Sequence, residues 1–593
     1  MSLVVKIPPM RFAEADDVRC FDFPASGVLV ALCVAILGMA LPSLRAQSFA
    51  DGRAFTPLAI TTPDSNSVAA NLADVTGAQT FYNDGVYGQN TTSWVVDAGL
   101  VWGGHEAISN LSYNYGSSDA LTTPDGHATA VGMLLGGMPA SAPHYWYKLG
   151  MAPLTVLGSA ALATSLNGDG SFEVSDTSVI SAYTNAAARG DVLSTSVGFT
   201  PDRAGVGTVS GLLDALAVAH PYTTMVAAAG NAGTEGSVGG PASGYNILSV
   251  GALDGGTNYG SVASFSSRGP QTTAWFDGST TVMAAGGAAT RPGVDLVAPG
   301  TSIVSAAYVT NASGQPQDGY YYTSLSGTSF AAPLVAGGAA LLLSTAKSAV
   351  EFSGITNEAT RSVVIKSVLM NSADKIAGWN NGQQISAGII TTTQALDWAM
   401  GAGRLNLNEA FEQYVYGTRG IPINASGLGV SVFSKGWDYG TVAMGMGNDY
   451  LLADQLFAGQ QISVTLDWLR RREWDSRLGT SGDYLDIAQA QLDLMVYRIL
   501  EGDDQLVARS ISPVSTTQSL YFAVNDPGAY RIHVGYSTNL FDLSGSYNSQ
   551  DYGIAWSVGT VPEPGTILLF LTGGAFLLWR RGLVSFCGWR NGA

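Results

Sequence analysis

Ser329 is the residue whose surroundings best suit chemistry. It lies in residues 324–333, where Gly, Thr and Ser lead into the small and apolar run 334–343. This pattern predicts a helix that begins at or near Ser329, with Pro333 in its first turn. Unpaired N–H groups and the helix dipole at such a start stabilise negative charge, which suits a serine nucleophile because its attack creates an oxyanion. Taken alone, the stretch is more typical of a serine that caps a buried helix.

Of the five histidines, His127 is the one in a setting that suits a general base. The small and apolar residues 126–136 predict a helix with a buried face, and His127 lies at its start. A lone histidine is more often a satisfied surface or core residue, and His144, His220 and His533 have no comparable context.

Two polar residues follow apolar runs typical of buried strands. Asp97 ends the run 94–97, so the pattern predicts a carboxylate at a strand tip. Thirty residues separate Asp97 from His127 (127 − 97 = 30), which leaves room for one strand-and-helix crossover. Asn231 follows the run 225–229, and its side-chain amide could donate to an oxyanion. Taken singly, each is more often an ordinary turn residue.

Together these stretches resemble the motifs of subtilisin-like serine proteases, the subtilases, in the family's order Asp, His, Ser. Residues 327–333 resemble the serine signature, and His127 begins a stretch similar to the family's His-Gly-Thr-His-Val-Ala-Gly. Two departures stand out, because Ala128 replaces the usual Gly of that motif and Ala130 replaces its second histidine.

The resemblance implies a serine endopeptidase. Ser329 would attack a peptide carbonyl while His127 takes its proton, and Asp97 would accept the Nδ1–H of His127. Asn231 and the Ser329 backbone N–H would hold the oxyanion. Asp125 is a rival for the role of Asp97, but it is too close to His127 in the chain to orient that ring in the family's manner.

Further stretches match the family in register, and the resemblance covers about residues 67–411. Ser196, Val197 and Gly198 resemble the edge strand whose backbone pairs with extended substrate, so we expect them to bind substrate. The other matches are residues 150–153, 249–252, 264–270, 295–300 and 401–406, together with His105 after Asp97.

The predicted architecture is α/β with a second, all-β unit. In residues 67–411, runs such as 94–96, 192–194, 225–228 and 247–250 predict buried strands, and helix-like stretches alternate with them. This indicates a subtilisin-like, doubly wound, mostly parallel sheet with helices on both faces, which binds ligands outside the carboxyl ends of its strands. Residues 420–558 alternate with period two between turn residues, which predicts an antiparallel β-sandwich. Parts of it resemble the β-domains of secreted bacterial peptidases, which implies a stabilising, substrate-binding or secretion role.

Both ends are typical of targeting segments. Residues 1–46 combine basic residues, an apolar core and Ala46 at a cleavage point, which predicts a signal peptide, with a retained anchor as the alternative. Residues 47–66 are expected to be a linker, too short for a folding pro-domain. Residues 561–593 hold Pro-Glu-Pro, an apolar stretch and a double arginine, and they resemble the PEP-CTERM sorting signal. That resemblance implies an exosortase-type processing enzyme and an exported protein at the cell surface or beyond, anchored transiently by the apolar helix.

Net charge and cysteine positions limit the classes of partner and of chemical site that the protein can have. With a net charge of -18 and a pI near 4.5, the surface repels nucleic acid and anionic lipid. The cysteines, at positions 20, 33 and 587, all lie in the end segments, so the mature protein would hold no thiol protease site or cysteine-ligated metal. We expect a monomer that acts on polypeptides and requires no cofactor. Structural calcium is common in the family, but no acidic cluster here has suitable ligand spacing.

Two other functions compete with a serine endopeptidase. An inactive subtilase-fold surface or binding protein is supported only by Ala128 and Ala130. An esterase of α/β-hydrolase type would place its histidine after its serine, whereas His127 precedes Ser329.

Overall fold

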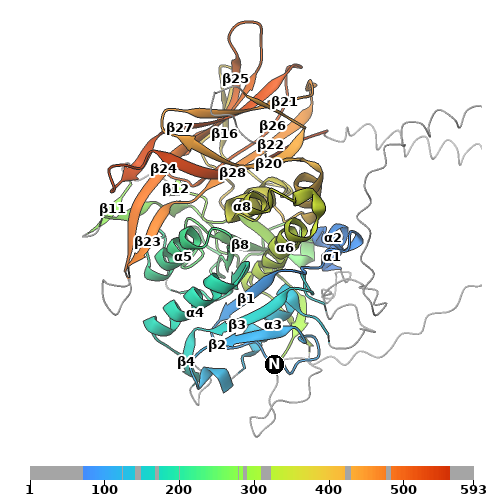
Figure 1. Ribbon diagram of the computed structural model, residues 1–593, viewed down its shortest axis with the longest axis vertical. Coiled ribbons are helices and arrows are strands. Elements are labelled where there is room, and N and C mark those ends of the chain that lie inside the picture. The colour runs from blue at the N-terminus through green and yellow to red at the C-terminus, as the bar shows by residue number, and fades with distance from the viewer. Residues whose placement is uncertain are drawn as a thin grey trace, which may run out of the picture.

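The computed structural model describes residues 71–560, apart from residues 123, 140–148, 167–171, 200, 278–279, 285–289, 309–321, 421–428 and 476–482. The predicted signal peptide (1–46), linker (47–66) and sorting segment (561–593) lie outside the described residues. Figure 1 shows an α/β unit in the lower half and a β-sandwich above it.

Seven parallel strands form the central sheet of the α/β unit, in the order β13-β8-β7-β6-β1-β3-β2. The strands are β1 (Thr92–Asp97), β2 (Leu111–Tyr115), β3 (Val156–Ala161), β6 (Val192–Thr195), β7 (Thr224–Ala228), β8 (Leu248–Leu253) and β13 (Leu296–Pro299). The predicted parallel sheet is confirmed. From β1 the chain builds β2 and β3 on one side and then returns to β6 on the other, so the topology switches direction between β1 and β6. Such a switch point is where open α/β sheets bind ligands.

Helices cover both faces of this sheet because successive strand residues point to opposite sides. Trp94 and Val96 pack with the helices of one face, and Val95 packs with those of the other. The first face carries α4 (Asp176–Arg189) and α5 (Thr208–Ala219), and the second carries α3 (Gly126–Gly136) and α6 (Thr328–Ser348). Helix α6 is long and apolar enough to cross a membrane, but its residues 328–346 are buried and belong to the core of the α/β unit.

The C-terminal unit is a sandwich of two mostly antiparallel sheets, as predicted. One sheet has the order β18-β20-β28-β22-β26, and the other has the order β16-β17-β25-β24-β27-β21-β19 with β23 beside β24. The strands of the first are β18 (Thr418–Arg419), β20 (Lys435–Ala443), β22 (Gln460–Trp468), β26 (Thr517–Ala523) and β28 (Ser549–Thr560). Those of the second are β16 (Gln383–Ser386), β17 (Ile389–Thr392), β19 (Val430–Val432), β21 (Gly447–Leu452), β23 (Arg471–Asp475), β24 (Asp483–Arg498), β25 (Gln505–Ser510) and β27 (Tyr530–Asp542).

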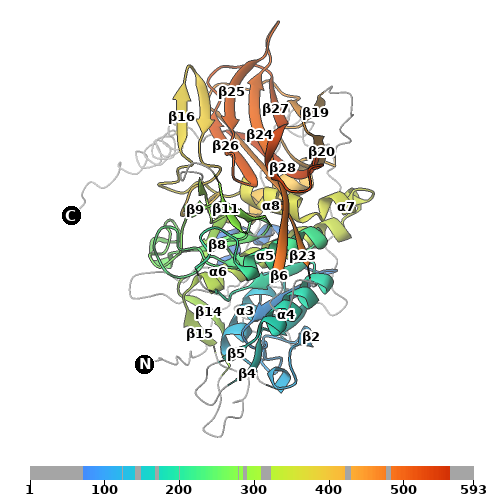
Figure 2. The ribbon, with the colours of Figure 1, turned by 90° about the vertical axis from the view of Figure 1, so that its left-hand side faces the viewer.

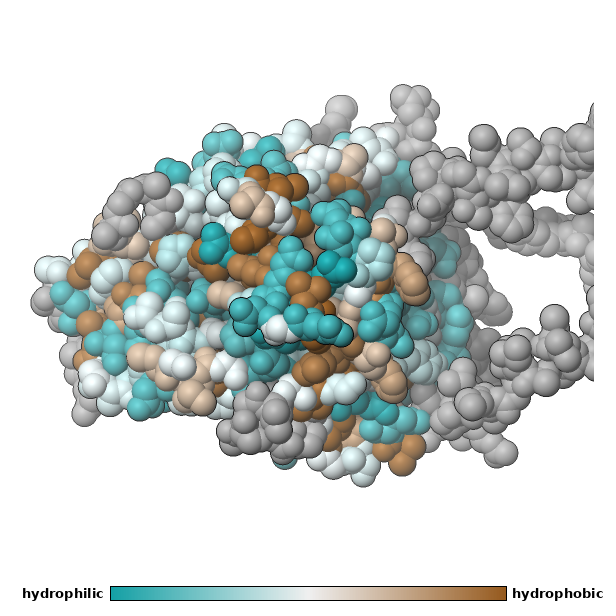
Figure 3. Space-filling view, turned by 90° about the horizontal axis from the view of Figure 1, so that it is seen from above, coloured by the Kyte–Doolittle hydropathy of each residue, from teal (hydrophilic) through white to brown (hydrophobic). Residues whose placement is uncertain are grey.

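Seen from above the view of Figure 1, the surface of the molecule carries hydrophobic residues interleaved with hydrophilic ones (Figure 3).

The two units are joined by shared elements. The hairpin β16–β17 comes from within residues 67–411, yet β17 pairs in parallel with β25 and Ile390 enters the sandwich core. Helix α8 (Ser362–Asn371) packs on β20, β22 and β28. In the opposite direction, β23 and the start of β24 extend from the sandwich onto α5 (Figures 1 and 2).

Smaller elements complete the fold. They are α1 (Leu72–Thr76), α2 (Gln79–Asn83), α7 (Thr356–Ala359), α9 (Leu407–Phe411), β4 (Ala163–Leu166), β5 (Phe172–Val174), β9 (Gln271–Thr272), β10 (Ala274–Phe276), β11 (Thr281–Met283), β12 (Thr290–Arg291), β14 (Ile303–Ala306) and β15 (Tyr322–Leu325).

Candidate active site

Asp97 and His127 meet at the carboxyl edge of the sheet. Asp97 ends β1 and His127 lies in the first turn of α3, and Asp97 Oδ2 lies 2.9 Å from His127 Nδ1. The Asp97 side chain is 2% exposed, and its other oxygen accepts the backbone N–H of Ala98 at 2.7 Å. The buried carboxylate therefore fixes the ring through Nδ1, which leaves Nε2 as the nitrogen for proton exchange.

The pKa of His127 reflects this pairing. Burial acts to lower the pKa, but the Asp97 carboxylate and, to a lesser degree, Asp125 outweigh burial and raise it above the usual 6.5. The imidazolium that would form during proton transfer is thus favoured by its surroundings.

Asp125, the rival carboxylate, caps the helix that carries His127. Its Oδ2 accepts the N–H of Ala128 at 2.8 Å, as an N-cap residue does. Ala128 and Ala130, the two departures from the family motif, are almost wholly buried in the core around α3. The two methyl groups thus belong to the packed interior.

Ser329 is the second residue of α6 and is 8% exposed. Its Oγ donates to the carbonyl of Ser196 at 3.2 Å, and the Ser196 hydroxyl donates back to the Ser329 carbonyl at 2.9 Å. Among the described residues, this carbonyl is the hydrogen-bond partner of Ser329 Oγ, and the His127 ring is not. The rings of Phe330 and His127 lie 5.7 Å apart, so the starts of α3 and α6 meet.

Asn231 follows β7 and faces the start of α6. Its Oδ1 accepts the backbone N–H of Thr328 at 2.9 Å and the Thr328 hydroxyl at 3.0 Å. The Thr328 oxygen also accepts the N–H of Gly230 at 3.1 Å. Because Oδ1 is occupied, Asn231 presents Nδ2 as a donor, and Nδ2 has no protein acceptor within the described part of the chain. The contact of Thr328 with Asn231 is not predicted from the sequence, although Thr328 stands directly before Ser329 in the motif.

Ser196, Val197 and Gly198 follow the end of β6 as irregular backbone. Ser196 is buried against Ser329, whereas Gly198 is exposed. The backbone groups of Val197 and Gly198 have no partner among the described residues, while Phe199 N–H donates to the Gly240 carbonyl at 2.8 Å. The structure thus places this segment beside Ser329 with free backbone groups, which suits pairing with an extended chain.

A metal does not suit the predicted site. Within the described residues, the one cluster with metal-ligand proximity is Asp97, Asp125 and His127, whose donor atoms lie within 4.8 Å of one another. Calcium takes six to eight oxygen ligands, whereas this cluster offers an imidazole nitrogen that is already bonded to a carboxylate. Structural calcium elsewhere and the lack of a cofactor requirement remain predictions from the sequence.

Comparison with known proteins identifies the family. The sequence model of the subtilase family, peptidase S8, matches residues 95–403, which is just over half of the chain. The chain belongs to the subtilase family. Subtilisin DY of Bacillus licheniformis is 31% identical to this subtilase over 273 residues, which cover 44% of this chain and 79% of that protein. Serine proteases of this family act on polypeptides, and the matched range contains Asp97, His127, Asn231 and Ser329.

Other relatives match this subtilase over smaller shares of their length. A thermophilic serine proteinase of Bacillus sp. (strain AK1) is 35% identical over 156 residues, covering 26% of this chain and 27% of that one. A subtilisin-like protease of Arabidopsis thaliana is 28% identical over 378 residues, which cover 62% of this chain and 30% of that protein. Among solved structures, the prenylagaramide maturation protease PagA matches with a TM-score of 0.39 and 22% identity, covering 57% of this chain and 98% of that one.

Proposed function

We propose that this subtilase is a serine endopeptidase that hydrolyses polypeptides through an acyl-enzyme. The observation that carries the proposal is the 2.9 Å contact between buried Asp97 and His127, at the sheet edge where Ser329 and Asn231 also lie. A serine hydroxyl becomes nucleophilic when an oriented imidazole can take its proton, and this pair supplies an oriented imidazole.

The proposed reaction begins with a rotation of the Ser329 hydroxyl. For the reaction, Oγ must leave the Ser196 carbonyl and reach His127 Nε2 by turning about Cα–Cβ, and such catalytic hydrogen bonds often tighten only when substrate binds. Oγ then bonds to the substrate carbonyl carbon while its proton passes to Nε2. The negative oxygen of the tetrahedral intermediate would receive hydrogen bonds from Asn231 Nδ2 and the Ser329 backbone N–H.

The intermediate then collapses. The carbon–nitrogen bond breaks, His127 gives its proton to the leaving amine, and the acyl group stays on Ser329. Water attacks the ester by the same route, with His127 again as base. Because the backbone groups of Val197 and Gly198 are free within the described chain, an extended polypeptide can continue along them, which favours internal cleavage.

The test compares the full chain with its Ser329→Ala variant in casein hydrolysis and fluorophosphonate labelling. We expect both signals from the parent protein and neither from Ser329→Ala. Ser344→Ala is the matched control, because Ser344 is a buried serine on the same helix that bonds to the Gln89 carbonyl, and it should keep both signals. Equal casein hydrolysis by the parent and Ser329→Ala would contradict the proposal.

One observation favours the alternative, an inactive subtilase-fold surface or binding protein. Ser329 Oγ is bonded to the Ser196 carbonyl, and in a protein without activity this contact would be permanent. Absence of fluorophosphonate labelling in a folded parent protein would support this alternative, since only an activated serine reacts.

We further propose that the protein is exported and that an exosortase-type enzyme removes residues 561–593. The support is the order of Pro-Glu-Pro, apolar stretch and double arginine in the sequence. Intact mass spectrometry of the mature protein from surface and secreted fractions locates both ends. A mature chain that retains Arg580 and Arg581 would contradict the processing step.

A further inference from the structure

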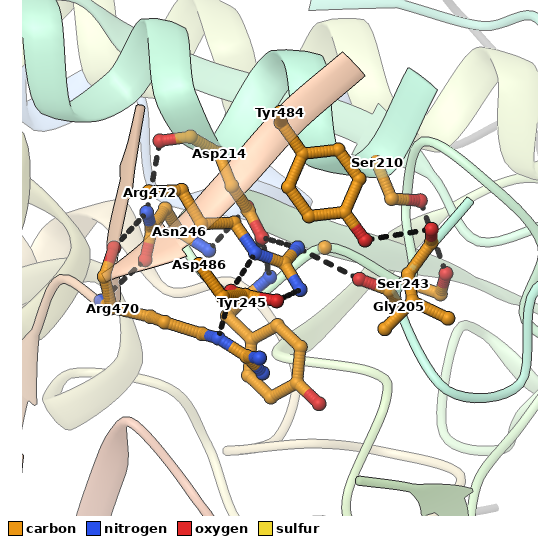
Figure 4. Close-up of polar contacts among 12 residues, drawn as sticks. Gly205, Ser210, Asp214, Ser243, Tyr245, Asn246, Arg470, Arg472, Tyr484 and Asp486 are labelled. Carbon is orange, nitrogen blue, oxygen red and sulfur yellow. Dashed lines mark hydrogen bonds and ion pairs between the residues drawn. The ribbon is translucent and has the colours of Figure 1, made fainter. Parts of the chain in front are cut away.

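The hairpin of β23 and β24 carries a buried charge cluster from the sandwich into the α/β unit (Figure 4). Arg470 and Arg472 are wholly buried, as are the side chains of Asp214 on α5 and Asp486 on β24. The two arginines balance the two carboxylates. Burial acts to raise the pKa of Asp486, but Arg470 and Arg472 outweigh it and hold that pKa below its usual value, so Asp486 stays ionised.

Arg472 binds groups from both units. Its Nε donates to Asp486 at 2.7 Å, within the hairpin. Its Nη1 lies 2.7 Å from Asp214 Oδ2 and 2.7 Å from the carbonyl oxygen of Gly205, both in the α/β unit. A guanidinium holds several acceptors in one fixed plane, so Arg472 sets where Gly205 lies relative to α5.

A second residue of the hairpin holds the same segment. The hydroxyl of Tyr484 donates to the Val206 carbonyl at 2.7 Å. The Tyr484 ring lies on Gly211 of α5, where an added Cβ would come within 1.9 Å of the ring. The hairpin therefore approaches α5 more closely than any residue with a side chain at position 211 would permit.

The segment held in this way leads directly to the substrate-binding residues. It runs back from Gly205 and Val206 to residues 196–198, beside Ser329. Its middle is tied at Pro201 and Phe199 to the stretch around Gly239 and Gly240. One end is thus fixed by the nucleophile's helix and the other by a side chain of the sandwich.

The stretch that follows Asn231 is anchored by the same cluster. It ends at Tyr245 and Asn246, whose N–H groups donate to Asp214 at 2.9 and 2.8 Å. The side chain of Asn246 exchanges two hydrogen bonds with the backbone of Arg470, each of 2.8 Å. Both stretches that border the candidate site therefore end on the hairpin.

We propose that Arg472 is a positioning residue for the substrate-binding segment 196–198, so that the sandwich sets how this subtilase holds an extended polypeptide. The proposal rests on the proposed peptidase function. A docked hairpin keeps the segment in place for pairing with substrate, whereas the hydroxyl, imidazole and carboxylate of the candidate triad touch none of the hairpin residues.

The test separates substrate binding from the reactivity of Ser329. In Arg472→Met we expect KM for an extended peptide to rise about ten-fold while kcat changes by less than about two-fold. The rate of fluorophosphonate labelling should stay within about two-fold of the parent rate, because that small probe does not need the segment. Arg531→Met is the matched control, since Arg531 pairs with Asp449 and Asp504 inside the sandwich, and it should leave KM unchanged.

A milder variant keeps the test decisive if Arg472→Met does not fold. Tyr484→Phe removes only the hydrogen bond to Val206, and we expect KM to rise about two- to ten-fold. Unchanged KM in the folded variants would overturn the proposal, as would labelling and kcat that fall together. A parent protein that is folded but unlabelled would instead refute the peptidase function.

Discussion

Replacing Thr328 by valine should slow the proposed reaction by an amount that follows from two hydrogen bonds. The Thr328 hydroxyl donates to Asn231 Oδ1 at 3.0 Å and accepts from Gly230 N–H at 3.1 Å. Valine has a similar shape and loses both bonds, each worth about 0.5–1.5 kcal/mol. The Thr328 backbone N–H still holds Asn231, so part of the orientation survives. We therefore expect the net loss to be about 1–2 kcal/mol, which lowers kcat about 5- to 30-fold because each 1.4 kcal/mol corresponds to a factor of ten.

The assay is steady-state hydrolysis of a peptide substrate, with kcat and KM measured separately and folding followed by circular dichroism. Asn231→Ala sets the upper limit, because the loss of the equivalent donor in subtilisin, a relative, lowers turnover about 10²- to 10³-fold. Thr345→Val is the matched control, because Thr345 is a buried threonine on the same helix whose hydroxyl donates to the Leu341 carbonyl. The reasoning would be refuted if Thr328→Val had the same kcat as the parent protein, or if Asn231→Ala lost no turnover.

Two further predictions concern pH and packing. Because an imidazolium cannot accept a proton, kcat/KM should fall as pH drops through a His127 pKa above 6.5. Asp97→Asn removes the larger of the two carboxylate effects that raise this pKa while burial remains, so the limb of the pH–rate profile should move to lower pH, and an unmoved limb would contradict the pairing. Gly211→Ala should lower the free energy of unfolding by about 1–3 kcal/mol or more, because the new methyl overlaps the Tyr484 ring. Thermal melts should show no such loss for Gly559→Ala, where nothing lies within 4 Å of the added carbon, and equal melting temperatures in the two variants would count against the packing.

Features fixed by local pattern could be predicted from the sequence. The strand before Asp97 and the helix that begins beside Ser329 follow from short apolar runs that end in characteristic residues. The contact between Asp97 and His127 was inferred from family order rather than from the residues alone, since each of them is common in turns and caps. Asp125 shows why the residue type alone does not suffice. It is also an aspartate close to His127, yet its carboxylate caps α3.

Features that depend on distant pairing could not be predicted. Arg472 and Asp214 are 258 residues apart, and nothing in the alternating pattern of β23 shows that its charged face is buried against another unit. Asp467 and Lys366 of α8 are likewise buried and lie 3.2 Å apart, although 101 positions separate them in the chain (467 − 366 = 101). The β16–β17 hairpin falls within the range predicted as α/β for the same reason, since its partner strand β25 lies more than a hundred residues further on.

Helix α6 has a consequence for how the chain reaches its destination. Its 21 residues satisfy the length and apolarity of a bilayer-spanning segment, although the folded protein buries all of them except Lys347 and Ser348 at its end. If the chain is threaded unfolded through an export channel, that channel meets an apparent stop signal in the middle of the cargo. Export then requires that this stretch passes the channel without inserting into the membrane, before it packs on the seven-stranded sheet.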